Sequence, residues 1–145
     1  MQEQNFKNHA RFVPLYHYVT FTLILAVIIG SVLKLYRSYT TGLHGLLVPV
    51  ILCLVSVILL LLAWFARSFA LAAQDRAIRA EENLRYFSIT GKLLDKKLSK
   101  GQIIALRFAP DEEFVELTNR AVKEDMKPVD IKKSIKNWKA DHNRA

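Results

Sequence analysis

The residue types that most often carry catalysis or bind metals are scattered through this 145-residue sequence. Its four histidines, His9, His17, His44 and His142, lie in four different segments. None has a second potential ligand three or four residues away, the spacing that places two ligands on one face of a helix. The five glycines form no phosphate-binding motif, and no serine or cysteine lies at a nucleophile elbow. The sequence therefore predicts a protein that is not an enzyme, with no catalytic residues, no metal site and no cofactor.

The element around which the chain is organised is an uncharged apolar run at residues 46–65. Of its 20 residues, 15 are Leu, Ile, Val or Phe. About 20 helical residues, rising about 1.5 Å each, cross the roughly 30 Å hydrocarbon core of a bilayer. A buried helix of a soluble protein is seldom apolar all round over this length in so short a chain. We therefore expect residues 46–66 to form a transmembrane helix, in which Cys53 is a small apolar side chain.

A second uncharged stretch, residues 12–33, precedes this run. Its 22 residues are too many for the apolar region of a typical signal peptide, and it ends at Lys34 and Arg37 without a small-residue cleavage site. We predict a first transmembrane helix at about residues 18–35. A short polar turn then makes the two helices an antiparallel hairpin over residues 16–66. Residues 1–15 are expected to be a cytosolic tail.

Charged residues are segregated from apolar ones, although the chain is 52% hydrophobic and 23% charged. Lys34 and Arg37 are the only charges between residues 12 and 66, whereas residues 67–145 contain 17 Lys and Arg against 12 Asp and Glu. Basic residues concentrate on the cytoplasmic side of membrane proteins, and four arginines follow the second span within 20 residues. We expect a multi-pass protein of the cytoplasmic membrane with both termini in the cytoplasm.

Residues 67–98 continue from the second span as a juxtamembrane helix, which Thr90 and Gly91 are expected to break, followed by a connector. Alanine is frequent in residues 67–88 and has the highest helix propensity. The spacing predicts ion pairs of Asp75 with Arg79 and of Glu81 with Arg85, four residues apart. The heptad positions Leu71, Ile78 and Leu84 or Arg85 make at most two heptads. This pattern favours a solvated extension over a coiled coil.

A compact unit of three short helices is predicted for residues 99–145. Ser99 and Gln102 have capping-box spacing, and Pro128 suits the first turn of the third helix. Three acidic residues follow Pro110, where the dipole of a new helix favours negative charge. The third helix is expected to present an apolar stripe and a neighbouring basic arc, composed of Ile131, Ile135 and Trp138 and of Lys132, Lys136 and Lys139. Because a unit this small seldom buries enough surface alone, we expect it to pack against something else.

Candidate interaction residues come from three features. Two small residues four apart in the first span could pack against the second span of the same hairpin, which is the favoured interpretation. They could instead form an interface between copies in an oligomer. The lysine arc could contact anionic lipid or be a solvated face. The three helices resemble a helix-turn-helix only loosely, and the arc lacks the residues that read bases, so nucleic acid is an unlikely partner. The candidates are Ala26, Gly30, Arg79, Glu82, Arg85, Arg107, Asp111, Glu112, Glu113, Lys132, Lys136, Trp138 and Lys139.

Several segments resemble an uncharacterised family of small bacterial two-span membrane proteins. The segments are FKNHARFVPLYHY, AAQDRAIRAEENLRYFSITGKLLD, LSKGQIIALRFAPDEEFVELTNRAV and IKKSIKNWKADHNR. The most specific parts are QDRAIRAEENLR and QIIALRFAPDEE. The resemblance covers almost the whole chain and implies a bacterial inner-membrane hairpin with a cytosolic helical tail. It implies no activity and no site residues.

Together these features predict an all-α membrane protein with a two-helix transmembrane hairpin, a long juxtamembrane helix and a small cytosolic three-helix unit. The favoured function is a non-enzymatic, membrane-anchored interaction or scaffold module that docks a partner or a second copy through its cytosolic helices. The alternative is an accessory subunit of a larger inner-membrane complex, such as a transporter or a respiratory enzyme. A membrane-tethered DNA-binding protein is the third hypothesis.

Overall fold

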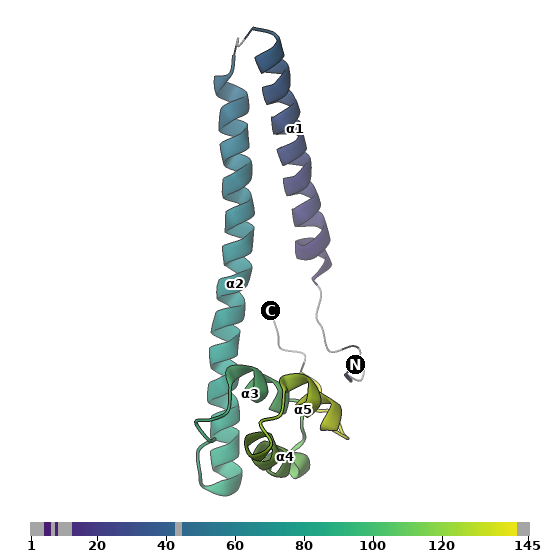
Figure 1. Ribbon diagram of the computed structural model, residues 1–145, viewed down its shortest axis with the longest axis vertical. Coiled ribbons are helices and arrows are strands. Elements are labelled where there is room, and N and C mark those ends of the chain that lie inside the picture. The colour runs from purple at the N-terminus through teal and green to yellow at the C-terminus, as the bar shows by residue number, and fades with distance from the viewer. Residues whose placement is uncertain (1–4, 7, 9–12, 43–44, 142–145) are drawn as a thin grey trace. The chain divides into compact units, whose positions relative to one another are not determined.

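The computed structural model describes residues 5–6, 8, 13–42 and 45–141. Its regular elements, in order, are a π-helical segment Leu15–Thr20, α1 Phe21–Thr40, α2 Leu47–Thr90, α3 Lys100–Leu106, α4 Asp111–Lys123 and α5 Pro128–Ser134 (Figure 1). The all-helical class predicted from the sequence is confirmed for these residues. Most of the predicted tail at residues 1–15, and the histidines at 9, 44 and 142, lie outside the described residues.

Contacts divide the chain into two compact units, with a boundary between Phe69 and Ala70. The first unit is a hairpin in which α1 lies antiparallel beside the first half of α2 (Figure 1). Two glycines in the turn have positive φ, 92° at Gly42 and 71° at Gly45. Glycine adopts this region without the clash that a Cβ would bring, so these residues allow the chain to reverse.

Small polar side chains lie where the two helices of the hairpin meet. The buried hydroxyls of Ser31 and Ser56 are 3.3 Å apart. Each also donates to the carbonyl four residues earlier in its own helix, Val27 for Ser31 and Leu52 for Ser56, so neither hydroxyl is left without a partner in an apolar contact. Near the other end of the hairpin, the hydroxyl of Tyr16 donates to the backbone carbonyl of Ala63.

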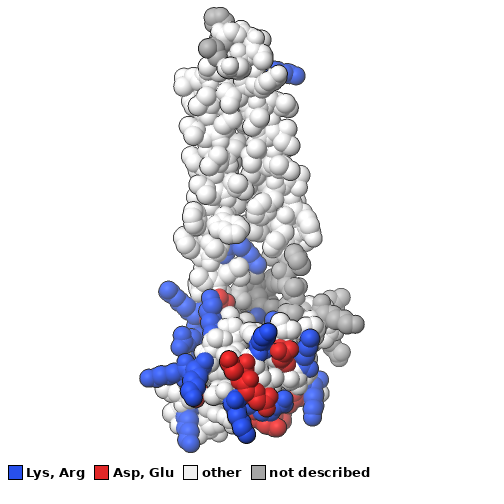
Figure 2. Space-filling model, in the orientation of Figure 1, with Lys and Arg blue, Asp and Glu red and all other residues white. Residues whose placement is uncertain are grey.

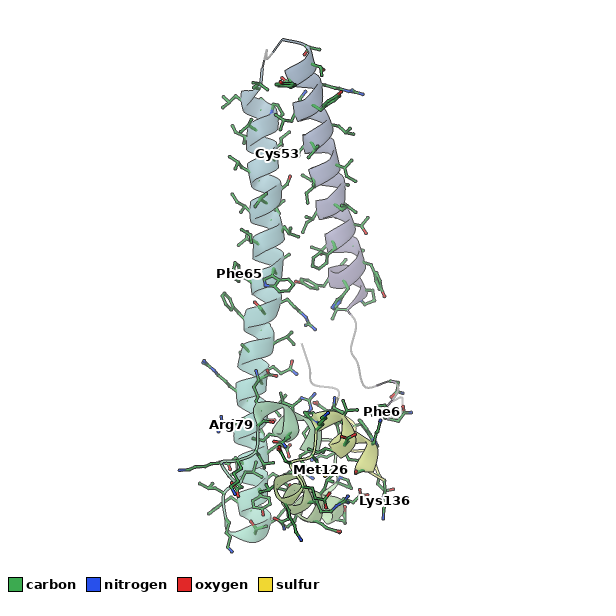
Figure 3. The ribbon with its side chains drawn as sticks, viewed as in Figure 1. Phe6, Cys53, Phe65, Arg79, Met126 and Lys136 are labelled. Carbon is green, nitrogen blue, oxygen red and sulfur yellow. The ribbon has the colours of Figure 1, made fainter. Side chains whose placement is uncertain are left out.

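The outward side chains of the hairpin are large and apolar on both helices. Figure 3 shows them spreading outward along the whole length of the hairpin, and Figure 2 shows this surface almost free of charge. Both Leu15–Thr40, with 26 residues, and Leu47–Thr90, with 44 residues, are long and apolar enough to cross a membrane. The shorter of the two spans roughly 39 Å as a helix, more than the hydrocarbon core requires.

The second helix continues through the alanine-rich segment and ends where the sequence predicted a break. Gly91 has a φ of 72°, and its N–H donates to the carbonyl of Phe87 at 2.8 Å. A left-handed glycine just after the last helical residue is a frequent helix terminus, because the chain leaves the helix while its last carbonyls are still satisfied. The hydroxyl of Thr90 adds a bond to the carbonyl of Tyr86.

The second unit is a helical core built by the last part of α2 and by α3, α4 and α5. The predicted capping box is present: the Ser99 hydroxyl accepts from the Gln102 N–H at 3.3 Å, and the Gln102 side chain accepts from the Ser99 N–H at 2.7 Å. Ile78 of α2 is buried, and Tyr86 packs against the core. The buried core residues are Leu98, Ile103, Ala105, Leu106, Phe108, Ala109, Phe114, Leu117, Ala121, Ile131 and Ile135.

The predicted third helix of this unit is shorter than the sequence indicated. Pro128 begins α5 as expected, but the helix ends at Ser134, and Ile135 is extended, with φ −72° and ψ 122°. The backbone N–H groups of Lys136 and Asn137 donate to the Glu113 carboxylate at 2.9 and 3.0 Å. These donors therefore have partners on α4 instead of within a helix. The prediction that Lys132, Lys136 and Lys139 share one helical arc, beside a stripe ending at Trp138, is wrong.

Candidate functional site

Arg85 joins two other predicted interaction residues, Glu82 and Asp111, in one cluster. Its Nη1 donates to Glu82 at 3.1 Å, and its Nε donates to Asp111 at 2.6 Å. Its Nη2 donates to the carbonyl of Ala109 at 2.8 Å, and its guanidinium lies 4.2 Å from the centroid of the Phe114 ring. Only 12% of the Arg85 side chain is exposed. The cluster thus fastens α2 to the start of α4, and it is an internal contact of the helical unit.

The two carboxylates of this cluster have opposite environments. Burial raises the pKa of Glu82 above its usual 4.5, and the neighbouring Arg85 opposes this change. The hydrogen bond and the positive charge of Arg85 lower the pKa of Asp111 below its usual 3.8. Because 66% of the Asp111 side chain is exposed, water screens its pairing with Arg85, and the buried Glu82 is the more sensitive member.

Arg107 is the second buried arginine of the unit, with 8% of its side chain exposed. Its Nη1 lies 3.2 Å from the Asp141 carboxylate, and its guanidinium lies 4.7 Å from the Phe108 ring centroid. The Trp138 ring packs against the same Phe108, with centroids 4.9 Å apart. The Nζ of Lys132 lies 5.5 Å from this ring. These contacts hold the segment after α5 against the α3–α4 connection.

The remaining acidic and basic candidates divide into internal and exposed residues. Glu113 accepts from the backbone of residues 136 and 137, so it is a structural acceptor, whereas Glu112 is exposed. Arg79 is also exposed, and no ion pair to it is found among the described residues. The predicted pairs Asp75–Arg79 and Glu81–Arg85 do not form. Asp75 instead pairs with Lys100 at 2.9 Å, and Arg85 with Glu82 and Asp111.

Basic residues of α5 and of the segment that follows it line an open groove in the same unit. Lys136 and Lys139 are exposed, whereas Lys132 and Trp138 are half-buried. The groove has a volume of about 470 Å³ and is lined by Asn5, Phe6, Lys132, Lys133, Ile135, Lys136 and Trp138. Lys133 approaches the ring of Phe6, with Nζ 5.9 Å from the centroid. Lysines with apolar stems and two aromatic rings make this surface suited to partners that carry negative charge or combine charged and apolar groups.

The small residues of the first span do not pack as the favoured interpretation predicted. Ala26 is exposed, and nothing lies within 4 Å of the position that a Cβ on Gly30 would occupy. The residue that faces α2 at this level is the adjacent Ser31. The hairpin is therefore held by its serines, and the Ala26–Gly30 surface is open on α1.

Sequence reasoning missed two features of the helical unit. Asn83 accepts from the N–H of Leu94 at 2.9 Å, which holds the connector beside α2. On α2 itself, Leu84 and Phe87 are 68% and 48% exposed. The heptad spacing of Ala77, Leu84 and their alanine neighbours indicates this second apolar face. The heptad predicted from the sequence instead joined Leu84 to Leu71 and Ile78, and Ile78 is buried within the unit.

No group of three or more potential metal ligands is found in the part of the chain that the structure describes. The clusters around Arg85 and Arg107 consist of ion pairs, backbone acceptors and aromatic rings, which stabilise contacts between helices. These side chains therefore hold the helices of the unit together.

In the residues that the structure describes, these features define an all-helical fold with two helices long and apolar enough to span a membrane, joined to a small packed helical unit. A family model described as "Family of unknown function (DUF6526)" matches residues 1–145, and the chain belongs to this family. No curated protein and no solved structure matches the chain.

Proposed function

We propose that this chain is a non-enzymatic, membrane-anchored interaction module of a bacterial cytoplasmic membrane. The hairpin is the anchor, and the helical unit docks a partner or a second copy on the cytoplasmic side. The bacterial origin is supported by the resemblance of its segments to small bacterial two-span proteins. The module function is supported by apolar side chains that remain exposed on the helical unit.

The observation that carries the membrane proposal is the outer surface of the hairpin. Leu23, Leu54, Ile58 and Trp64 are examples of large apolar residues that are more than half exposed there. Soluble monomers seldom expose continuous apolar patches beyond a few hundred Å², because water penalises them. Surrounded by hydrocarbon, the same surface is stabilised, and the helical backbone satisfies its own hydrogen bonds.

Membrane fractionation with a matched pair of variants tests the anchor. Ile58 and Val129 have similar exposure, 54% and 51%, but Ile58 belongs to the hairpin and Val129 to the helical unit. An Asp in the middle of a span costs roughly 3 kcal/mol on insertion. Because the other apolar residues of both candidate spans still favour insertion, Ile58→Asp should lower the share of chain in the carbonate-resistant pellet only in part, and Val129→Asp should not change it. Wild-type chain in the supernatant would disprove the anchor.

Cysteine labelling tests the orientation. In a Cys53→Ala background, a cysteine placed at Ala145 should react with a membrane-impermeant maleimide only after the cytoplasmic membrane is opened. A cysteine placed at Thr41, in the turn of the hairpin, should react in spheroplasts that are still sealed. The reverse pattern would place the helical unit outside the cytoplasm and contradict the orientation.

An accessory subunit of a larger membrane complex is the second candidate, favoured by the open Ala26–Gly30 surface on α1. Small residues let a neighbouring helix approach closely within a bilayer. Purification in mild detergent at native expression distinguishes the two. Another membrane protein in constant stoichiometry, lost in an Ala26→Leu variant, would support the accessory subunit. Chain that purifies alone or with itself favours the module.

A further inference from the structure

A continuous exposed face follows the last part of α2, within the helical unit. Its residues alternate at spacings of three and four, which keeps them on one side of a helix. They are Ala70, Ala73, Ala77, Ala80, Leu84 and Phe87, and all six are exposed. We call this surface the Ala70–Phe87 face. Its two largest members, Leu84 and Phe87, are 68% and 48% exposed.

The opposite side of the same segment is already occupied by the unit itself. Ile78 is buried, Glu82 and Arg85 form the cluster at the start of α4, and the hydroxyl of Tyr86 donates to Asn119 at 3.3 Å. A partner seated on the Ala70–Phe87 face therefore meets no obstruction from α3, α4 or α5. The alanines let a second helix approach closely, and Leu84 and Phe87 offer apolar area at one end.

Two exposed charges flank this face, one on each side. With Ala70 and Ala77 as the first position of successive heptads, Arg76 occupies position g and Glu81 the following position e. No ion pair to either is found among the described residues. When two copies of this segment lie parallel and in register, Arg76 of one meets Glu81 of the other, and symmetry makes the pair twice. In an antiparallel pair, g faces g and e faces e, so this complementarity is lost.

We propose that a second copy of this chain covers the Ala70–Phe87 face in a parallel two-helix contact. This inference rests on the proposed membrane anchor, because copies inserted in one direction can meet only in parallel. The anchor also confines the copies to a plane, which raises their effective concentration. This confinement matters because alanines bury little apolar area, so the contact is weak between freely diffusing chains.

Disulfide cross-linking in membranes tests the contact residue by residue. The full chain is used in a Cys53→Ala background, with one cysteine replacing Ala73, Ala77, Ala80 or Leu84. The controls are Ala72→Cys and Arg79→Cys, exposed neighbours about 100° around the helix from Ala73 and Ala80. A disulfide requires Cα atoms about 4.4–6.8 Å apart, so covalent dimer should be roughly tenfold more abundant at the face positions than at the controls.

Charge exchange tests the register. In the Ala80→Cys chain, Arg76→Glu or Glu81→Arg alone places like charges opposite each other twice, and each should reduce the cross-linked dimer several-fold. The double variant Arg76→Glu/Glu81→Arg restores opposite charges and should restore the yield. Arg79→Glu, which makes the same change of charge away from the face, should leave the yield unchanged.

Two kinds of result overturn the dimer. Equal yields at face and control positions indicate random collision, and adducts whose mass differs from twice that of the chain indicate a different partner. The fractionation experiment is scored separately. Pelleted chain with a flat cross-linking profile refutes the dimer and leaves the anchor intact. Chain in the supernatant refutes the anchor, and with it the parallel contact that depends on the anchor.

Discussion

Substitution of Arg85 is the sharpest test of how the helical unit is held to α2. Arg85→Met keeps much of the length and apolar stem of the side chain and removes the guanidinium. The buried Glu82 then loses the charge that lies 3.1 Å away, and the carbonyl of Ala109 loses its donor. The contact with the Phe114 ring is lost as well.

The loss of stability expected for Arg85→Met follows from the burial of the groups that Arg85 contacts. Removing one partner of a buried ion pair costs about 3–5 kcal/mol, and the cation–π contact adds roughly 0.5–1 kcal/mol. The exposed Asp111 contributes less than about 1 kcal/mol. Protonation of Glu82 and the apolar methionine offset part of the loss. We expect the helical unit to be destabilised by about 3 kcal/mol, which corresponds to roughly 100-fold faster amide exchange.

Hydrogen–deuterium exchange of the full chain in mild detergent measures this effect on the amides of α4. Arg79→Met is the matched control, since Arg79 is an exposed arginine of the same helix, and its effect should stay within about 0.5 kcal/mol. The double variant Glu82→Gln/Arg85→Met removes both charges and should recover much of the stability. Equal exchange in Arg85→Met and Arg79→Met, or a double variant worse than Arg85→Met, would refute the reasoning.

Three further predictions concern single groups. Because burial raises the pKa of Glu82, the Glu82 carboxyl binds a proton more tightly in the folded unit than in the unfolded chain. The protonated carboxyl therefore contributes stability below about pH 4.5, and this contribution is lost as the pH rises. Glu82→Gln should therefore flatten the decrease in the free energy of unfolding as the pH rises above about 4.5. Glu113→Ala removes the acceptor for two backbone amides, and trypsin should cleave after Lys136 roughly tenfold faster, as gel densitometry would show. Gly91→Ala places a Cβ at a φ of 72° and should cost about 1 kcal/mol, seen as a lower thermal midpoint; an unchanged midpoint would show that the turn relaxes.

Local signals in the sequence predicted the helices and several of their ends. The apolar runs, the Ser99–Gln102 capping box, the first turn at Pro128 and the break at Gly91 each depend on residues close together in the chain. Such signals do not require knowledge of tertiary contacts, because capping and backbone geometry act over one turn. The helices and helix ends predicted from these signals are therefore present in the structure.

Contacts between distant residues could not be predicted in this way. Arg85 donates a hydrogen bond to Asp111, 26 residues away, and not to the predicted Glu81. Asp75 pairs with Lys100 instead of Arg79. The end of α5 is decided by Glu113, more than 20 residues earlier in the chain. These pairs depend on which side chains the fold brings together and not on strong pairing, because Asp111 and Lys100 are mostly exposed and exposed pairs contribute little. The same limit applies to Ala26 and Gly30, whose spacing was visible but whose orientation depends on Ser31 and Ser56.

The contact of Trp138 with Phe108, with ring centroids 4.9 Å apart, also gives the protein a built-in optical probe. The sequence contains two tryptophans, and the other, Trp64, belongs to the hairpin and is 67% exposed. Replacing Trp64 with Phe leaves one half-buried indole, whose emission depends on its exposure to water. Detachment of the segment after α5 then becomes a spectral shift that can be followed in real time, without an attached dye.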